Sequence, residues 1–207
     1  MKHPAGIIFD CDGVLFESRR ANLAYYNAIL AEFGEAPVAE TDQARAHLCH
    51  TAASPQVLGC LLGEERTPAA LDFAAVLDYR QFIPEMQPEP GMSEALAVLS
   101  SRYPLAVATN RGRSMPDIIS HFELGDHFKT VVTSHDVPRP KPFPDMLLEA
   151  ARRLRIVPGD LLFIGDSELD QAAAQAAGMA FAAYKQKLQA DFHLASYAEL
   201  LELFAGE

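Results

Sequence analysis

Acidic side chains follow a short apolar run near the beginning of the chain. The stretch GIIFDCDG carries Asp10 and Asp12 directly after apolar residues. Aspartate is unfavourable inside a strand and is rarely buried without a partner, so its place at the end of such a run needs a reason. One reason is a turn, since Asp and Gly are common turn residues. The other is a nucleophile beside a general acid or base, and this stretch alone leaves both open.

Later stretches add polar groups of complementary chemistry. PLAVATN ends in Thr109 and Asn110, Lys141 stands among the prolines of PRPKPFPD, and LLFIGDSELD carries Asp166 and Asp170. Carboxylates are the ligands of hard divalent cations, and an ammonium group binds phosphate as a point charge. These residue types therefore favour phosphoryl chemistry if the fold brings them together.

Short apolar runs would position these groups. The runs are nearly continuous rather than alternating, which is typical of parallel strands that are covered on both faces. The strands are expected over residues 6–10, 104–110, 129–134, 161–166 and 178–184.

Helical patterns separate these runs and complete the expected fold. They cover residues 93–101, 145–154, 167–177 and 196–204. Alternating strands and helices predict an α/β fold with a Rossmann-like, doubly wound parallel sheet. Ligands of such sheets bind outside the carboxyl ends of the strands, so the polar residues above should meet at one edge.

One long region contains only helical patterns. An amphipathic helix is expected over residues 21–34, with shorter helices over 54–62 and 68–82. A stiff connection with three prolines follows at 83–91. We therefore predict an α/β core domain formed by residues 1–16 and 85–207, and an inserted helical cap domain formed by residues 17–84.

Carboxylates gathered at one edge repel one another, because most aspartates are ionised at neutral pH. A divalent cation removes this repulsion. An oxygen-only ligand set that shares a phosphate with the substrate suits Mg²⁺ better than zinc. Lys141 would neutralise further charge.

Composition limits the class of partner. The chain has 207 residues and a net charge of −11, so it should repel nucleic acid and anionic membranes.

No apolar run approaches the length of a membrane span, and the N-terminus lacks a secretory pattern. The cysteines, Cys11, Cys49 and Cys60, follow no disulfide or zinc spacing. We expect a cytoplasmic protein, and the sequence does not indicate an oligomeric state.

Four segments in this order resemble the haloacid dehalogenase superfamily of phosphotransferases. They are DCDGVLF, ATN, KPFPD and GDSELD. The resemblance covers essentially the whole chain, because the helical insert lies where that family places its first type of cap. It implies an enzyme, a Mg²⁺-dependent phosphatase of a small phosphorylated metabolite, and its general pattern is similar to phosphoglycolate phosphatases.

The resemblance also implies roles for individual residues. Asp10 is the nucleophile that becomes an aspartyl phosphate, and Asp12 is the general acid and base. Thr109, Asn110 and Lys141 bind the phosphoryl group. Mg²⁺ is held by Asp10, by the backbone carbonyl of Asp12 and by Asp166, while Asp170 supports these ligands from behind.

Other functions remain open at this point. Dehalogenating members of the family lack an acid at the position of Asp12, which favours phosphoryl transfer here. A sugar phosphomutase of the β-phosphoglucomutase type is the first alternative, because the stretch TSHDV is similar to that group. A receiver-type signalling domain or a catalytically silent binding protein are further alternatives, opposed by the helical insert and by the complete set of motif residues.

Basic residues outside these motifs are candidates for substrate contact. Arg45, His47 and His50 lie in ARAHLCHTAASP, which we expect to be a cap loop that faces the substrate. Arg111, together with Arg113 and Arg139, flanks the expected site and could attract an anion. For all of them, a surface position without substrate contact is the alternative.

A cysteine phosphatase is a weaker interpretation. Such enzymes place an arginine six residues after the cysteine, but Glu17 occupies that position after Cys11. Cys60 has Arg66 at this spacing, yet two glutamates between them would repel a phosphate. We therefore expect Cys11 to be a packing residue and the spacing at Cys60 to be accidental.

Overall fold

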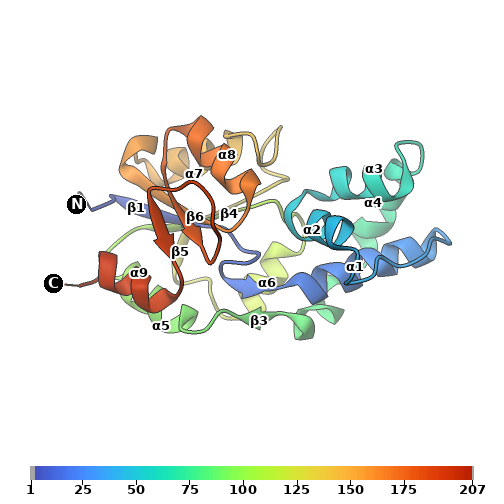
Figure 1. The fold of residues 1–207 in the computed structure, drawn as a ribbon, viewed down its shortest axis with the longest axis horizontal. Coiled ribbons are helices and arrows are strands. Elements are labelled where there is room, and N and C mark those ends of the chain that lie inside the picture. The colour runs from blue at the N-terminus through green and yellow to red at the C-terminus, as the bar shows by residue number, and fades with distance from the viewer. Residues whose placement is uncertain (1–2, 207) are drawn as a thin grey trace.

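A six-stranded parallel sheet forms the centre of the larger part of the molecule (Figure 1). The structure is a computed structural model that describes residues 3–206. The strand order is β5-β4-β1-β6-β7-β8, and a separate antiparallel pair joins β2 to β3. The strands are β1 Gly6–Phe9, β2 Phe16–Glu17, β3 Gln87–Pro88, β4 Leu105–Thr109, β5 Phe128–Thr133, β6 Leu161–Gly165, β7 Ala180–Tyr184 and β8 Phe192–Leu194.

Helices lie on both faces of this sheet and at one end of it. The helices are α1 Arg19–Glu32, α2 Gln43–Thr51, α3 Ser54–Leu62, α4 Thr67–Val76, α5 Met92–Ser100, α6 Met115–His121, α7 Asp145–Leu154, α8 Glu168–Ala177 and α9 Tyr197–Phe204. Short 3₁₀ turns cover Tyr79–Gln81, Ile83–Glu85 and Pro158–Asp160.

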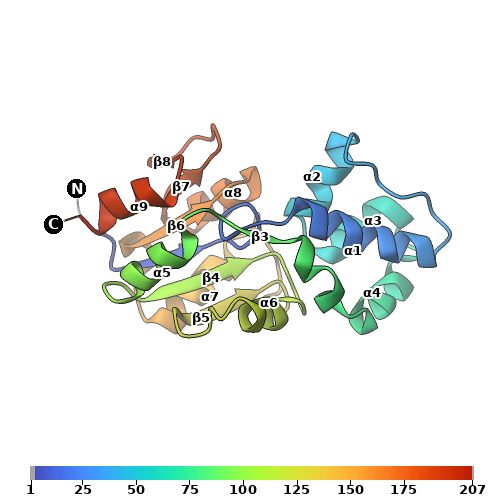
Figure 2. The same cartoon turned by 90° about the horizontal axis from the view of Figure 1, so that it is seen from below.

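Two apolar layers hold the sheet between its helices. Along β1, Ile7 and Phe9 pack into the layer that contains residues of α5, α6 and α9, whereas Ile8 packs into the layer of α7 and α8. Figures 1 and 2 show these two groups of helices on opposite faces of the sheet. Both faces of the strand are therefore covered, which explains its continuous apolar sequence. The predicted doubly wound α/β fold is confirmed.

Helices α1 to α4 form a unit beyond the carboxyl end of β1 (Figures 1 and 2). They enclose an apolar cluster of their own, in which Ile29 and Leu58 are fully buried. The chain enters this unit through β2 and leaves it through β3, and the two strands pair with each other. This arrangement agrees with an inserted helical cap, while the domain boundaries at residues 16/17 and 84/85 stay a prediction.

The structure corrects several expected elements. Helices α2 and α6 and strand β8 were not predicted, and the helix expected over residues 68–82 ends at Val76. It ends there because Leu77 is extended and Asp78 begins a new turn, in which its side chain accepts a hydrogen bond from the backbone N–H of Arg80. The connection expected over residues 83–91 is also not simply extended, since it contains a 3₁₀ turn and β3.

Truncation of the cap cluster should destabilise the helical unit more than the sheet. Ile29→Ala removes a fully buried side chain, and we expect it to cost about 2–5 kcal/mol in the free energy of unfolding. Hydrogen exchange should accelerate in α1 to α4 while β1, β4 and β6 keep their protection. Val76→Ala is the control, since this side chain is 80% exposed and its loss should change stability by less than about 0.5 kcal/mol. Equal acceleration in the sheet would show that the helices are not a separate cooperative unit.

Candidate active site

Acidic residues from two neighbouring strands meet at one edge of the sheet. β1 pairs in register with β6, so Phe9 lies beside Ile164, and Asp10 and Asp166 directly follow the ends of their strands. One carboxylate oxygen from each of Asp10, Asp166 and Asp170 lies within 4.8 Å of the others. The convergence expected from the sequence is present.

Lys141 lies between two of these carboxylates. Its Nζ atom is 2.8 Å from Oδ1 of Asp10 and donates a hydrogen bond of 2.6 Å to Oδ1 of Asp170. It also donates to the carbonyl oxygen of Ala108, at 3.2 Å. The lysine side chain is 2% exposed, so these interactions take place away from bulk solvent. Lys141 thus fixes the position of Asp10 relative to β4 and α8.

Asp170 supports the site from the first turn of α8. Its Oδ2 accepts hydrogen bonds from the backbone N–H of Asp166 and of Ser167 and from the Ser167 hydroxyl, at 3.2, 3.0 and 2.6 Å. Ser167 returns a bond from its Oγ, which accepts from the N–H of Asp170 and completes a capping box. Ser167 therefore caps the N-terminus of α8, and the hydrogen bonds of Asp170 connect this helix to the end of β6.

Close approach of backbone and side chains makes the site compact. Gly13 has φ of +74°, and a Cβ atom at this position would lie 2.0 Å from Oδ2 of Asp166. Glycine is required there both by the backbone conformation and by the carboxylate. The Asp–Gly turn considered for the first motif is therefore present as well, and it lets Asp166 reach the acids of that motif.

The acidic cluster contains more negative charge than its lysine can neutralise. Burial raises the pKa of Asp10 to about 7 against the opposing effect of Lys141, and Asp170 and Asp12 raise it further. Burial, followed by Asp170 and Asp10, also raises the pKa of Asp166 well above its usual range. Oδ1 of Asp10 is buried and lies 2.8 Å from the Nζ atom of Lys141. Such a set of oxygen atoms fits a hard divalent cation.

Asp12 belongs to a second network, on the side of the helical unit. Its Oδ1 accepts hydrogen bonds from Nη2 of Arg111 at 2.6 Å, from Nδ2 of Asn22 at 3.0 Å, and from the hydroxyl of Ser18. Arg111 also donates to Oδ1 of Asn22 at 2.7 Å and to the hydroxyl of Tyr79 at 2.6 Å. The network therefore joins the first motif to α1 and to the turn after α4.

This network keeps Asp12 ionised. Burial acts to raise the pKa of Asp12, but the charge of Arg111, followed by His50 and the hydrogen bonds from Arg111 and Ser18, outweighs it and lowers the pKa. The pKa values of Asp10 and Asp12 are thus shifted in opposite directions: burial and acidic neighbours raise that of Asp10, and Arg111 lowers that of Asp12. Such divergence is typical of carboxylates with different roles in one site.

Thr109 and Asn110 lie at the same edge of the sheet, as predicted, but the side chain of Asn110 binds backbone groups of the protein. Its Nδ2 donates to the carbonyl oxygens of Thr51 and Lys141, at 3.0 and 3.1 Å, and its Oδ1 accepts from the N–H of Lys141 at 2.9 Å. The amide therefore holds the Lys141 loop and touches the helical unit. Thr109 accepts a hydrogen bond from the N–H of Arg111 at 3.1 Å.

The three candidates in the cap lie on helix α2 rather than on a loop, which corrects our expectation. His50 is buried, with its Nε2 atom 3.9 Å from Oδ2 of Asp166, whereas Arg45 is exposed and pairs with Asp42. His47 reaches across to the sheet part and contacts Glu168 at 2.8 Å. Among these three, His50 alone faces the acids.

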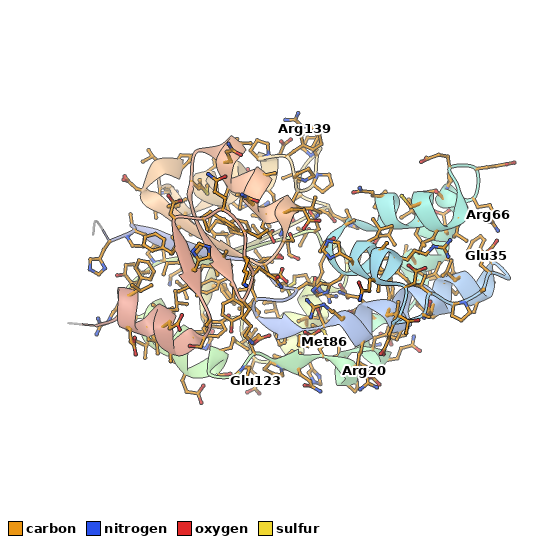
Figure 3. All side chains as sticks on the ribbon, in the orientation of Figure 1. Arg20, Glu35, Arg66, Met86, Glu123 and Arg139 are labelled. Carbon is orange, nitrogen blue, oxygen red and sulfur yellow. The ribbon has the colours of Figure 1, made fainter. Side chains whose placement is uncertain are left out.

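The flanking arginines also differ from one another. Arg111 is buried, which contradicts an exposed loop position, while Arg113 and Arg139 are exposed. Arg139 pairs with Asp145 and points outward from the sheet part (Figure 3). Arg66 lies at the far end of the helical unit, where it pairs with Glu35 at 2.8 Å (Figure 3). That position agrees with an accidental spacing after Cys60.

A cavity of about 940 Å³ opens between the helical unit and the sheet part. Its wall includes Asp12, Asn22, His50, Asn110 and Arg111. The size is that of a small-molecule pocket. The cavity reaches the site from the side of Asp12, so it lies where a group attached to a phosphate at Asp10 would extend.

Comparison with known proteins identifies the family. The family model described as "Haloacid dehalogenase-like hydrolase" matches residues 7–184. The chain belongs to this family. A phosphoglycolate phosphatase of Rhodobacter capsulatus is 34% identical over 192 residues, which cover 87% of this chain and 84% of that protein. A phosphoglycolate phosphatase of Chromobacterium violaceum is 30% identical, with 98% and 97% of the two chains covered.

A solved structure agrees with this assignment. The crystal structure of a haloacid dehalogenase superfamily hydrolase from Geobacter sulfurreducens, of subfamily IA, has a TM-score of 0.84 and 36% identity. It covers 97% of this chain and 99% of its own. The enzyme class predicted from the motifs, a phosphatase of this family, is confirmed. Within residues 3–206, none of the helices has the length and apolar character that crossing a membrane requires.

Three residues of the Asp12 network, Asn22, Ser18 and Tyr79, were not predicted from the sequence. Asn22 is a polar residue on the buried stripe of α1, and Tyr79 lies in the turn after α4. A signal was present for Asn22, since an amide inside an apolar stripe needs a buried hydrogen-bond partner. Ser18 and Tyr79 had no such signal, because the fold alone brings them to the site.

The close packing of Asp170 against β6 can be tested with two glycine substitutions. At Gly165, an added Cβ atom would lie 2.4 Å from the Cβ of Asp170. We expect Gly165→Ala to destabilise the protein by about 1–3 kcal/mol in chemical unfolding, because Asp170 must move away from Lys141. Gly159→Ala is the control, with its nearest neighbouring atom at 3.9 Å. Equal stability of the two variants would contradict this packing.

Proposed function

We propose that this protein hydrolyses a small phosphomonoester with Mg²⁺, through an aspartyl phosphate formed on Asp10. The main support is the position of this carboxylate. It is buried at the end of β1, 2.8 Å from the ammonium group of Lys141 and next to Asp166. A nucleophile held in this way is desolvated and oriented before the substrate arrives.

The residues that would hold Mg²⁺ are Asp10, Asp166 and the backbone carbonyl of Asp12. Asp170 lies in the same cluster, but its oxygens already accept hydrogen bonds from Lys141 and Ser167. When bound, Mg²⁺ supplies positive charge that offsets the charge on the phosphoryl oxygens and on the acids. The raised pKa values of Asp10 and Asp166 support the need for such a charge.

In the first step, a carboxylate oxygen of Asp10 attacks phosphorus and forms a P–O bond. The bond from phosphorus to the leaving oxygen breaks. Asp12, which Arg111 keeps ionised in the structure, first takes up a proton from solvent and then donates it to that oxygen. Lys141 and Thr109 hold the phosphoryl oxygens during the transfer. In the second step, Asp12 takes a proton from a water molecule that attacks phosphorus, which releases phosphate and regenerates Asp10.

The helical unit makes a small substrate the best candidate. It contacts the sheet part through Asn110 and Thr51 and through Asp12 and Asn22, on the rim of the cavity. A cover of this kind excludes bulk water during the first step. The relatives that are 30% and 34% identical are phosphoglycolate phosphatases, which favours hydrolysis over transfer to a sugar and makes phosphoglycolate the first substrate to test.

Asp12→Ala should separate the two steps. p-Nitrophenyl phosphate has a good leaving group, so it needs little help from an acid in the first step but still needs a base in the second. With Mg²⁺ present, we expect a burst of one nitrophenol per enzyme and then turnover at least about 10²-fold below wild type. The phosphate should remain on Asp10, visible as added mass in acid-quenched protein.

Two controls accompany this measurement. Asp10→Asn should give neither burst nor added mass, because the amide is a far poorer nucleophile, and EDTA should abolish the burst of Asp12→Ala. Cys60→Ser should behave like wild type. Steady turnover by Asp12→Ala at the wild-type rate would show that another group acts as the base.

A further inference from the structure

Arg111 is a buried cation that lines the cavity. Its side chain is 6% exposed and donates hydrogen bonds to Asp12, Asn22 and Tyr79. The guanidinium carbon lies 5.1 Å from the centre of the Tyr79 ring. Of the five donors of a guanidinium group, Nε finds no hydrogen-bond partner within residues 3–206. A buried donor without a partner is costly, and this one belongs to a residue that lines the cavity.

His50 repeats this pattern in the same cavity. It comes from α2 of the helical unit and also lines the cavity, and its Nε2 atom is buried and lacks a hydrogen-bond partner in the described part of the chain. Its Nδ1 atom lies 3.4 Å from Nδ2 of Asn22, which itself binds Asp12. Two polar atoms without partners thus border the space next to Asp12.

The other arginines of the cavity wall are of a different kind. Arg80 and Arg113 are exposed, and Arg80 is already bound to Asp78 through hydrogen bonds of 2.7 to 3.1 Å. Surface charges of this sort are screened by water and ions. Among the described residues that line the cavity, Arg111 alone is a buried arginine.

We infer that Arg111 binds a carboxylate of the substrate, one or two carbon atoms away from the phosphate ester. This inference rests on the proposed function, because it names the substrate class of the same site: a short phosphorylated carboxylic acid. In the structure Arg111 already binds a carboxylate, that of Asp12. A planar guanidinium group matches a carboxylate through parallel hydrogen bonds, which Lys cannot provide.

The position of Arg111 sets the reach of the substrate. Asp12 must come within hydrogen-bond distance of the leaving oxygen, and Arg111 is 2.6 Å from Asp12. A substrate carboxylate on Arg111 therefore lies within about three hydrogen-bond lengths, at most roughly 9 Å, of that oxygen. Long or branched acids place their charge farther away, so the geometry favours the shortest ones.

Substrate binding would also release Asp12. A carboxylate that takes Nη2 of Arg111 removes one of three donors from Oδ1 of Asp12, and the bonds from Asn22 and Ser18 remain. Asp12 is then free to turn toward the leaving oxygen. Arg111 would thus link recognition of the acid to the start of the reaction, which discriminates against neutral phosphate esters.

The first test uses the wild-type enzyme and two substrates of equal shape. Phosphoglycolate and its amide differ only in the charged end. We expect kcat/KM to be at least about 10²-fold higher for the acid, since the amide lacks the negative charge that would draw Arg111 away from Asp12. Equal values for both would overturn the role of Arg111 and leave the proposed hydrolysis intact. If the enzyme hydrolyses neither compound and also fails to hydrolyse p-nitrophenyl phosphate, the proposed function itself is wrong.

The second test assigns the preference to one arginine. Arg111→Gln should reduce the acid-to-amide ratio of kcat/KM to near one, and Arg111→Lys should keep only part of it. Arg113→Gln is the matched control from the same loop and should keep the wild-type ratio. An equal loss on both substrates in Arg111→Gln would show that Arg111 merely positions Asp12. Loss of the ratio in Arg113→Gln would show that the preference depends on Arg113, and it would overturn the assignment to Arg111. Circular dichroism confirms folding, and the wild-type comparison holds even if a variant fails to fold.

Discussion

The structure depends on the convergence of negative charge at the carboxyl ends of β1 and β6. Asp10, Asp166 and Asp170 come within 4.8 Å of one another, and a single ammonium group, that of Lys141, lies among them. Such an arrangement costs free energy unless more positive charge is added. The capping box of α8 and the glycine turn after Asp12 hold the carboxylates in place despite this repulsion. The same crowding that costs free energy suits these oxygen atoms to a hard divalent cation.

A second charged contact links this cluster to the helical unit. Arg111 lies between Asp12, on the sheet side, and Asn22 and Tyr79, on the helical side. Breaking a buried pair of this kind typically costs about 3–5 kcal/mol, so Asp12 keeps its place as long as nothing competes for the arginine. The helical unit and Asp12 are therefore held by one side chain, and any anion that binds there affects both.

The sequence predicted the strand ends, and with them the core of the site, because apolar runs that stop at Asp10, Thr109 and Asp166 leave few alternatives for a parallel sheet. It did not predict α2, whose sequence has little apolar periodicity and whose first turn is capped by Asp42. It also left Arg111 between a surface position and a substrate contact. Burial of that arginine results from residues of α1 and of the turn after α4, which only tertiary structure brings to the loop.

The repulsion within the acidic cluster can be measured directly through Asp166→Asn. The pKa of Asp10, raised to about 7, means that stability is lost as the pH rises from about 4 to 7, so thermal unfolding should be followed at pH 8, where the repulsion is fully present. We predict that the variant is more stable than wild type in EDTA, and that Mg²⁺ stabilises wild type far more than the variant, by about 2.7 kcal/mol at one hundred times its dissociation constant. A wild-type protein that Mg²⁺ does not stabilise, together with a variant that gains nothing in EDTA, would contradict the account.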